Sequence, residues 1–82
     1  MNEVAYTVIW APAATEDLRR LDKDELFDVL NNVMTLARTP RPPFSGEVPG
    51  GDGLFMLVVG TVTVTYEVIG LSVVILGVRR AR

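Results

Sequence analysis

The segment Leu54–Val78 constrains the fold of this chain more than any other part of the sequence. It contains three runs rich in apolar and β-branched residues, which are separated at Gly60 and Gly70. Runs of this length predict strands, and a glycine between two of them predicts a tight turn. Because such short turns join neighbouring antiparallel strands, we predict a meander. Its predicted strands are Leu54–Val59, Val62–Val68 and Ser72–Val78.

The first hairpin of this meander has one face without charge. Alternation along its strands places five side chains on that face: Met56, Val58, Thr61, Thr63 and Thr65. None of them carries a charge or titrates near neutral pH. The other face of the second strand, with Val62, Val64 and Tyr66, is predicted to be core, and the Tyr66 hydroxyl is expected to be hydrogen-bonded there. The hairpin thus has the shape of a binding surface without the charges of an active site.

The N-terminal half predicts one strand and two helices. Val4–Trp10 is rich in β-branched and aromatic residues and predicts a strand. Pro12 suits the first turn of a short helix, because its fixed φ fits there and its missing N–H is not needed. The spacing of Asp22 and Glu25 is that of a capping box, and Pro40 disfavours a helical residue before it, so a second helix is predicted between them. The predicted apolar stripe of this helix is Leu26, Phe27, Leu30, Val33, Met34 and Ala37.

These elements predict a single α+β domain over residues 1–82. A helical hairpin packs on one face of a four-stranded antiparallel sheet, and the proline- and glycine-rich segment Arg41–Gly53 is predicted to be a loop. Two helices cover only one face of such a sheet, yet Leu54–Val59 and Val73–Leu76 are apolar on both faces. The second face is therefore expected to be covered either by a partner or by the loop together with the end of the second helix.

The composition excludes several kinds of site. The 82 residues include no cysteine and no histidine, which removes thiolate ligands, the usual general base and the commonest metal ligand. We therefore expect no metal and no cofactor. The net charge is −2, whereas proteins that bind nucleic acid by charge are normally basic. However, Arg79, Arg80 and Arg82 can make one end locally positive. The first residues lack a signal-peptide pattern and no apolar run is long enough to span a bilayer, so a cytoplasmic protein without a membrane segment is expected.

The order and spacing of several motifs resemble the RelE/ParE superfamily of toxins from type II toxin–antitoxin pairs. The motifs span almost the whole chain and are Tyr6–Ala14, Asp17–Leu21, the loop Pro40–Gly53, Gly60–Val68 and Val73–Arg80. RelE-like members cleave messenger RNA in the ribosomal decoding site, and ParE-like members inhibit DNA gyrase. Both are neutralised by an antitoxin that wraps the toxin with a helix and an extended segment. The resemblance implies a RelE-like fold and a RelB-like cognate antitoxin as partner.

The resemblance also implies site residues. In RelE-like nucleases, basic residues on the exposed sheet face and an arginine after the last strand neutralise the scissile phosphate. Arg79 and Arg80 match the basic pair of the family, so Arg80 is expected to stabilise the phosphate and Arg79 to assist. Positions that are basic in the family are Met56 and Thr63 here. The residues expected to line the RNA- or partner-binding surface are Met56, Thr63, Thr65 and Arg82.

Three functions remain open from the sequence. The first is a RelE-like toxin, which would be a metal-independent, ribosome-dependent endoribonuclease that inhibits translation. The second is a ParE-like, non-enzymatic inhibitor of gyrase. The third is a catalytically degenerate member that retains only the surface for its antitoxin or for a homo- or hetero-oligomer. The first is the leading interpretation, because Arg79 and Arg80 match the basic pair of the family. The uncharged hairpin face keeps the third open, since removing even one preorganised donor lowers a rate by about 10²–10³.

Overall fold

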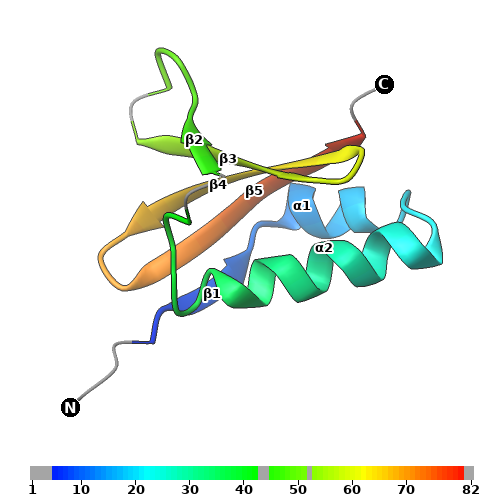
Figure 1. The fold of residues 1–82 in the computed structure, drawn as a ribbon, viewed down its shortest axis with the longest axis horizontal. Helices are drawn as coiled ribbons and strands as arrows, with labels where there is room; N and C mark the ends of the chain where they lie inside the picture. Colours follow the sequence, from blue (N-terminus) through cyan, green and yellow to red (C-terminus); the bar gives the residue numbers. More distant parts are fainter. Residues whose placement is uncertain (1–4, 43–44, 52, 81–82) are drawn as a thin grey trace.

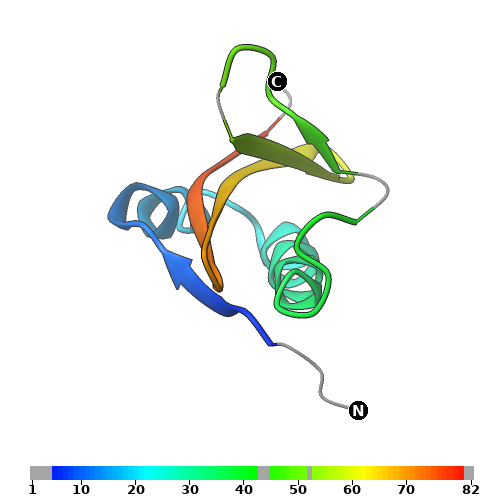
Figure 2. The same cartoon turned by 90° about the vertical axis from the view of Figure 1, so that its left-hand side faces the viewer.

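The computed structural model describes residues 5–42, 45–51 and 53–80, and it shows two helices on the same side of a five-stranded sheet (Figures 1 and 2). The elements in chain order are β1 (Thr7–Trp10), α1 (Pro12–Leu18), α2 (Lys23–Thr35), β2 (Ser45–Glu47), β3 (Leu54–Val59), β4 (Val62–Ile69) and β5 (Ser72–Arg80). The strand order across the sheet is β1-β5-β4-β3-β2. In the described part of the chain, no helix has the length and apolar character needed to cross a membrane.

The predicted α+β architecture is confirmed, but two predictions about the sheet are wrong. The sheet is mixed, because β1 runs parallel to β5 while the other pairs are antiparallel. The two helices lie between β1 and the meander in the chain, and a helical crossover of this kind brings two strands together in the same direction. The segment Arg41–Gly53 is also not entirely loop, since β2 pairs with β3 and places Gly46 opposite Met56. Its prolines and glycines limit β2 to a short strand at the sheet edge.

The predicted turns and helix starts are confirmed. Gly60 and Gly70 have φ angles of +61° and +59°, which only glycine adopts without strain. Pro12 occupies the first turn of α1. At the start of α2, the Asp22 carboxylate accepts a hydrogen bond from the Glu25 N–H, and the Glu25 carboxylate accepts one from the Asp22 N–H, both at 2.9 Å. This reciprocal capping box satisfies two donors that the first helical turn cannot pair internally.

The buried face of α2 differs from the predicted stripe. Phe27 and Met34 are 67% and 71% exposed, whereas Val29, Val33 and Leu36 are buried. Two overlapping sets of apolar residues recur at helical spacing along this helix, and only one set can face the sheet. The predicted stripe is therefore wrong at Phe27 and Met34, because contact with the sheet selects the other set.

The core lies between the helices and one face of the sheet, with Tyr66 at its centre. Tyr66 is fully buried and its hydroxyl donates a hydrogen bond of 2.7 Å to the carbonyl of Pro40, so its predicted core role is confirmed. The ring stacks on Phe55 with 5.6 Å between centroids, and the Arg41 guanidinium lies 5.2 Å from the centre of the Phe55 ring. Burial raises the pKa of Tyr66 above its usual value. These contacts hold the start of the proline-rich segment against the core side and not against the opposite sheet face.

A β-bulge interrupts the pairing of β5 with β4. Tyr66 pairs with Ile75 and the preceding residue, Thr65, pairs with Gly77, so Leu76 is an extra residue in β5. An extra residue reverses the alternation of side chains beyond it. The bulge therefore decides which side chains at the end of β5 face the helices.

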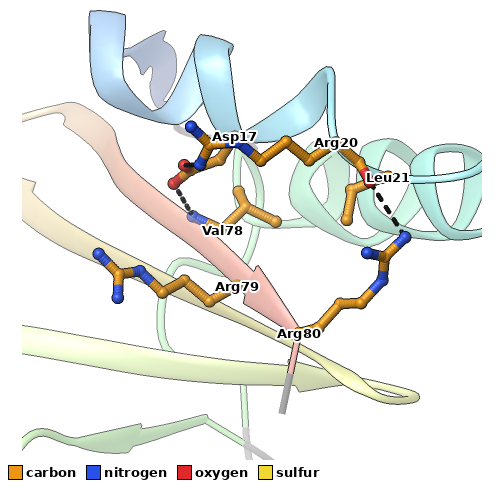
Figure 3. Close-up of a pocket in the computed structure, with 6 residues that line it drawn as sticks. All are labelled: Asp17, Arg20, Leu21, Val78, Arg79 and Arg80. Carbon is orange, nitrogen blue, oxygen red and sulfur yellow. Dashed lines mark hydrogen bonds and ion pairs between the residues drawn. The ribbon is translucent and has the colours of Figure 1, made fainter. Parts of the chain in front are cut away.

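Beyond the bulge, the two arginines of β5 lie on opposite faces of the sheet. Val78 is buried, and Arg80 pairs with the buried residue Val62, whereas Arg79 pairs with Thr63. Residues directly opposite in an antiparallel pair project from the same face. Arg80 is thus directed to the helix side and Arg79 to the open side, as their side chains show in Figure 3.

Candidate functional site

The sheet face turned away from the helices carries two rows of side chains that cross its strands. In the first row, Val58 pairs with Thr63 and Thr63 with Arg79. In the second row, Met56 pairs with Thr65. The common face predicted for Met56, Val58, Thr63 and Thr65 is therefore present, and Arg79 joins it from β5. We call this surface the open face.

The open face offers apolar surface, hydroxyl groups and one guanidinium in these two rows. Val58 is 60% exposed and Met56 is 36% exposed, while Thr63 and Thr65 are half-buried. Threonine hydroxyls donate hydrogen bonds but carry no charge, so the positive charge of the rows belongs to Arg79. A guanidinium presents its donors in a rigid fork that matches the geometry of a phosphate. This arrangement can hold a phosphate but provides no group that titrates near neutral pH.

Arg80 extends away from Arg79 on the other side of β5 (Figure 3), where the start of α2 holds it. Its Nε donates to Glu25 Oε2 at 2.9 Å and its Nη2 donates to Glu25 Oε1 at 2.7 Å. The same Nη2 donates to the carbonyl oxygen of Arg20 at 3.0 Å. Two-point pairing of this kind is among the strong polar contacts of proteins. The structure therefore does not bring Arg80 together with Thr63 and Thr65, and Arg82 lies outside the described residues.

The Arg80 contact changes the acidity of Glu25. Its hydrogen bonds from Arg80, followed by the one from the Asp22 N–H, lower the pKa of Glu25 from 4.5 to about 2. The same pairing raises the pKa of Arg80 above its usual value. A carboxyl group with a lowered folded-state pKa stabilises the fold at pH values above its unfolded pKa, and this contribution is lost as the pH falls from 4.5 toward 2.

Removing Arg80 is expected to raise the pKa of Glu25. In Arg80→Ala, the pKa should move from about 2 back toward 4.5, because only the Asp22 N–H then favours the ionised carboxyl. An NMR titration that follows the Glu25 side-chain carboxyl carbon measures the pKa directly. Arg79→Ala serves as control and should leave it near 2. A Glu25 pKa that stays unchanged in Arg80→Ala would contradict this pairing.

The last residue pair between β1 and β5 is Trp10 with Ile75. A cavity of about 360 Å³ lies beside the part of β5 that extends beyond this pair. We call this cavity the arginine pocket. At its wall, the Val78 N–H donates to Asp17 Oδ2 at 2.9 Å, and Asp17 Oδ1 pairs with Arg20 Nη1 at 3.3 Å. In Figure 3, Arg20 and Arg79 extend toward the same side of the view, and Arg80 extends away from them. The lining residues are Asp17, Arg20, Leu21, Val78, Arg79 and Arg80.

The sequence interpretation did not single out Arg20 or Glu67. Alternation along β4 places Glu67 on the same face as Thr63, which the spacing alone indicates. Four residues of strand separate them by about 13 Å, so Glu67 does not contact a phosphate that Arg79 holds. Arg20 reaches the pocket only because α1 packs beside β5, and the sequence carries no signal for that. Within residues 5–42, 45–51 and 53–80, no cluster of acidic side chains is suited to hold a metal ion.

The comparisons with known proteins find relatives by structure. No family model matches the sequence, and no curated protein matches it significantly. A chain of the toxin–antitoxin complex RelBE2 from Mycobacterium tuberculosis is 28% identical, with a TM-score of 0.84 over 94% of this chain and 99% of that chain. The isolated Escherichia coli RelE toxin is 17% identical, with a TM-score of 0.83 over 95% of this chain and 86% of that chain. A chain of the chromosomal ParDE toxin–antitoxin system from Pseudomonas aeruginosa is 16% identical, with a TM-score of 0.70 over 93% of this chain and 96% of that chain.

These likenesses agree with the element order derived above. The neighbours below 25% identity share the fold, and the Mycobacterium tuberculosis chain adds sequence identity over nearly the full length of both chains. They cover 93–95% of this chain, which includes the strand, helical hairpin and three-stranded meander that the sequence motifs predict. The chain is thus similar to toxins of the RelE/ParE superfamily, in fold to all three and in sequence to the Mycobacterium tuberculosis chain.

Proposed function

We propose that this chain is the toxin of a type II toxin–antitoxin pair, and that it inhibits translation by ribosome-dependent cleavage of messenger RNA until a RelB-like antitoxin neutralises it. The observation that supports this proposal is the row of Val58, Thr63 and Arg79 across the open face. It combines an exposed surface on which a base can lie, a hydroxyl donor and a guanidinium. The fold neighbours include chains from toxin–antitoxin complexes.

In this proposal Arg79 is the residue that contacts the phosphate. Cleavage through the 2′-hydroxyl develops negative charge on the phosphate, which a preorganised guanidinium stabilises. Arg80 is a positioning residue, because its pairing with Glu25 holds the end of β5 and keeps Arg79 turned to the open face. Since the open face provides no base that titrates near neutral pH, the protons of the reaction are exchanged with the ribosome or with water.

A second candidate function is binding without cleavage. It is favoured by the neutral side chains at Met56 and Thr63, where the family resemblance expects basic residues. In this case the open face serves only to bind the antitoxin or another copy of a toxin. Inhibition of gyrase remains a further outcome of the test.

Induced expression in a bacterial host, with and without the cognate antitoxin, tests the proposal. We expect growth arrest that the antitoxin reverses, together with new messenger RNA ends inside translated codons. Mapping of RNA ends with and without a translation initiation block measures the dependence on ribosomes. Growth arrest with intact messenger RNA and inhibited DNA supercoiling would replace the proposal with gyrase inhibition. Absence of arrest would leave the binding function.

A further inference from the structure

The arginine pocket is positively charged although the chain as a whole is acidic. Three of its lining residues are arginines and one is an aspartate, whereas the net charge of the chain is −2. The charge of Arg80 is balanced by Glu25 at 2.7 Å. The guanidinium groups of Arg20 and Arg79 are therefore the positive groups that a ligand in the pocket would meet.

Arg20 is available to a ligand. Its side chain is 74% exposed and its contact with Asp17 is long, at 3.3 Å. Exposed ion pairs of this kind are weak and exchange readily. Asp17 does not depend on Arg20 for its place, because its other oxygen accepts the hydrogen bond from the Val78 N–H. Arg20 can thus turn toward an anion while the pocket wall remains intact.

We propose that the arginine pocket binds a backbone phosphate of a single nucleic-acid strand, with Arg20 and Arg79 as its two contacts. This inference deepens the proposed function and rests on it for the identity of the strand. Arg79 lies both in the pocket and in the row with Val58 and Thr63. A strand whose base lies on Val58 therefore meets Arg79 at the open face, and Arg20 is the other exposed guanidinium that the same pocket offers to its backbone. Single-stranded nucleic acid is bound by such a combination of base contacts and a positive path for the phosphates.

The structure favours a nucleic-acid strand over an acidic peptide that extends the sheet as the occupant. A peptide that added to the sheet beside β5 would need the backbone N–H of Val78, since β1 ends before this point. That N–H is already bound by Asp17. A phosphate needs only the guanidinium groups, which remain accessible.

The test is an NMR titration of the folded protein with a single-stranded 2′-deoxy hexanucleotide, which cannot be cleaved through a 2′-hydroxyl. At low ionic strength we expect the Nε–H signal of Arg20 and the amide signal of Val78 to shift. Arg20→Ala should weaken binding about 5–10-fold and reduce the salt dependence by about one released ion. Arg20→Lys retains the charge and should recover most of the affinity.

Arg19→Ala is the matched control. Arg19 is also 74% exposed and pairs with an acidic neighbour, Glu16, at 3.8 Å, but it does not line the pocket. Its substitution removes the same charge and should change the affinity less than about twofold. An equal loss of strand affinity in Arg20→Ala and Arg19→Ala would mean that only the overall charge matters, and it would overturn the proposal. Unchanged strand binding in Arg20→Ala, with a weakened antitoxin complex, would assign the pocket to an acidic peptide instead.

The outcomes for the pocket and for the proposed function are separable. Strand binding is measured without ribosomes and without cleavage. If no cleavage occurs in cells but the protein binds the strand selectively through Arg20, the nuclease function is rejected and the phosphate site in the pocket is retained. If cleavage occurs in cells but Arg20 has no selective effect on strand binding, the phosphate site in the pocket is rejected and the nuclease function is retained.

Discussion

Arg79→Ala is expected to lower the rate of messenger RNA cleavage on ribosomes by about 10²–10³, the usual cost of removing one preorganised electrostatic donor. Arg79 supplies the positive charge of the row with Val58 and Thr63, and no neutral neighbour there can replace it. Its side chain is exposed, so the substitution should leave the folded structure intact. Single-turnover cleavage of a programmed ribosome, with thermal unfolding of the same preparations, measures both effects.

Arg80→Ala and Glu25→Gln are the comparisons for this result. Both weaken the contact between β5 and α2, so both should lower thermal stability. Any loss of cleavage in these variants should be in proportion to their loss of thermal stability. If Arg80 contacts the phosphate itself, Arg80→Ala loses activity far beyond Glu25→Gln, while Arg79→Ala remains active. That pattern would reverse the roles of the two arginines.

Leu36→Ala is expected to have the largest effect on stability. Leu36 is fully buried at the end of α2, and replacing a buried leucine with alanine costs about 2–5 kcal/mol of unfolding free energy. Small domains have roughly 5–15 kcal/mol in total, so the loss is a large part of the stability. Met34→Ala on the same helix is the control, because Met34 is 71% exposed. It should change the free energy by less than about 0.5 kcal/mol.

Chemical unfolding in urea, followed by the fluorescence of Trp10, measures both variants. Similar losses for Leu36→Ala and Met34→Ala would mean that Met34 is covered in solution. In that case α2 would contact the core or another molecule through the predicted stripe of Phe27 and Met34.

Local patterns predicted the elements of this fold well. The Gly60 turn, the capping box of Asp22 and Glu25 and the buried position of Tyr66 each depend on residues close together in the sequence. Backbone conformation, helix capping and strand alternation act over a few residues, so the sequence states them directly. The resemblance to the RelE/ParE superfamily rested on the order of these predicted elements, and β2 was not among them.

Two features of the fold depended on contacts between distant segments. The apolar residues of α2 form two overlapping stripes, and packing against the sheet buried Val33 and Leu36 while it left Phe27 exposed. The direction of β1 depended on its pairing with β5 after the helical crossover. Neither choice leaves a distinct pattern in the sequence. Both sets of α2 residues are apolar, and the pattern of β1 is the same whichever direction the strand takes.

The sequence by itself determined the elements of this protein other than β2, the uncharged hairpin face from Met56 to Thr65 and the place of the arginines near the end of the last strand. Only the tertiary structure decided which arginine faces which side. The bulge at Leu76 reverses the alternation of β5, so that Arg80 meets Glu25 and Arg79 joins Thr63. A bulge forms where pairing and packing with the neighbouring strand favour it, so the sequence of β5 alone does not predict it.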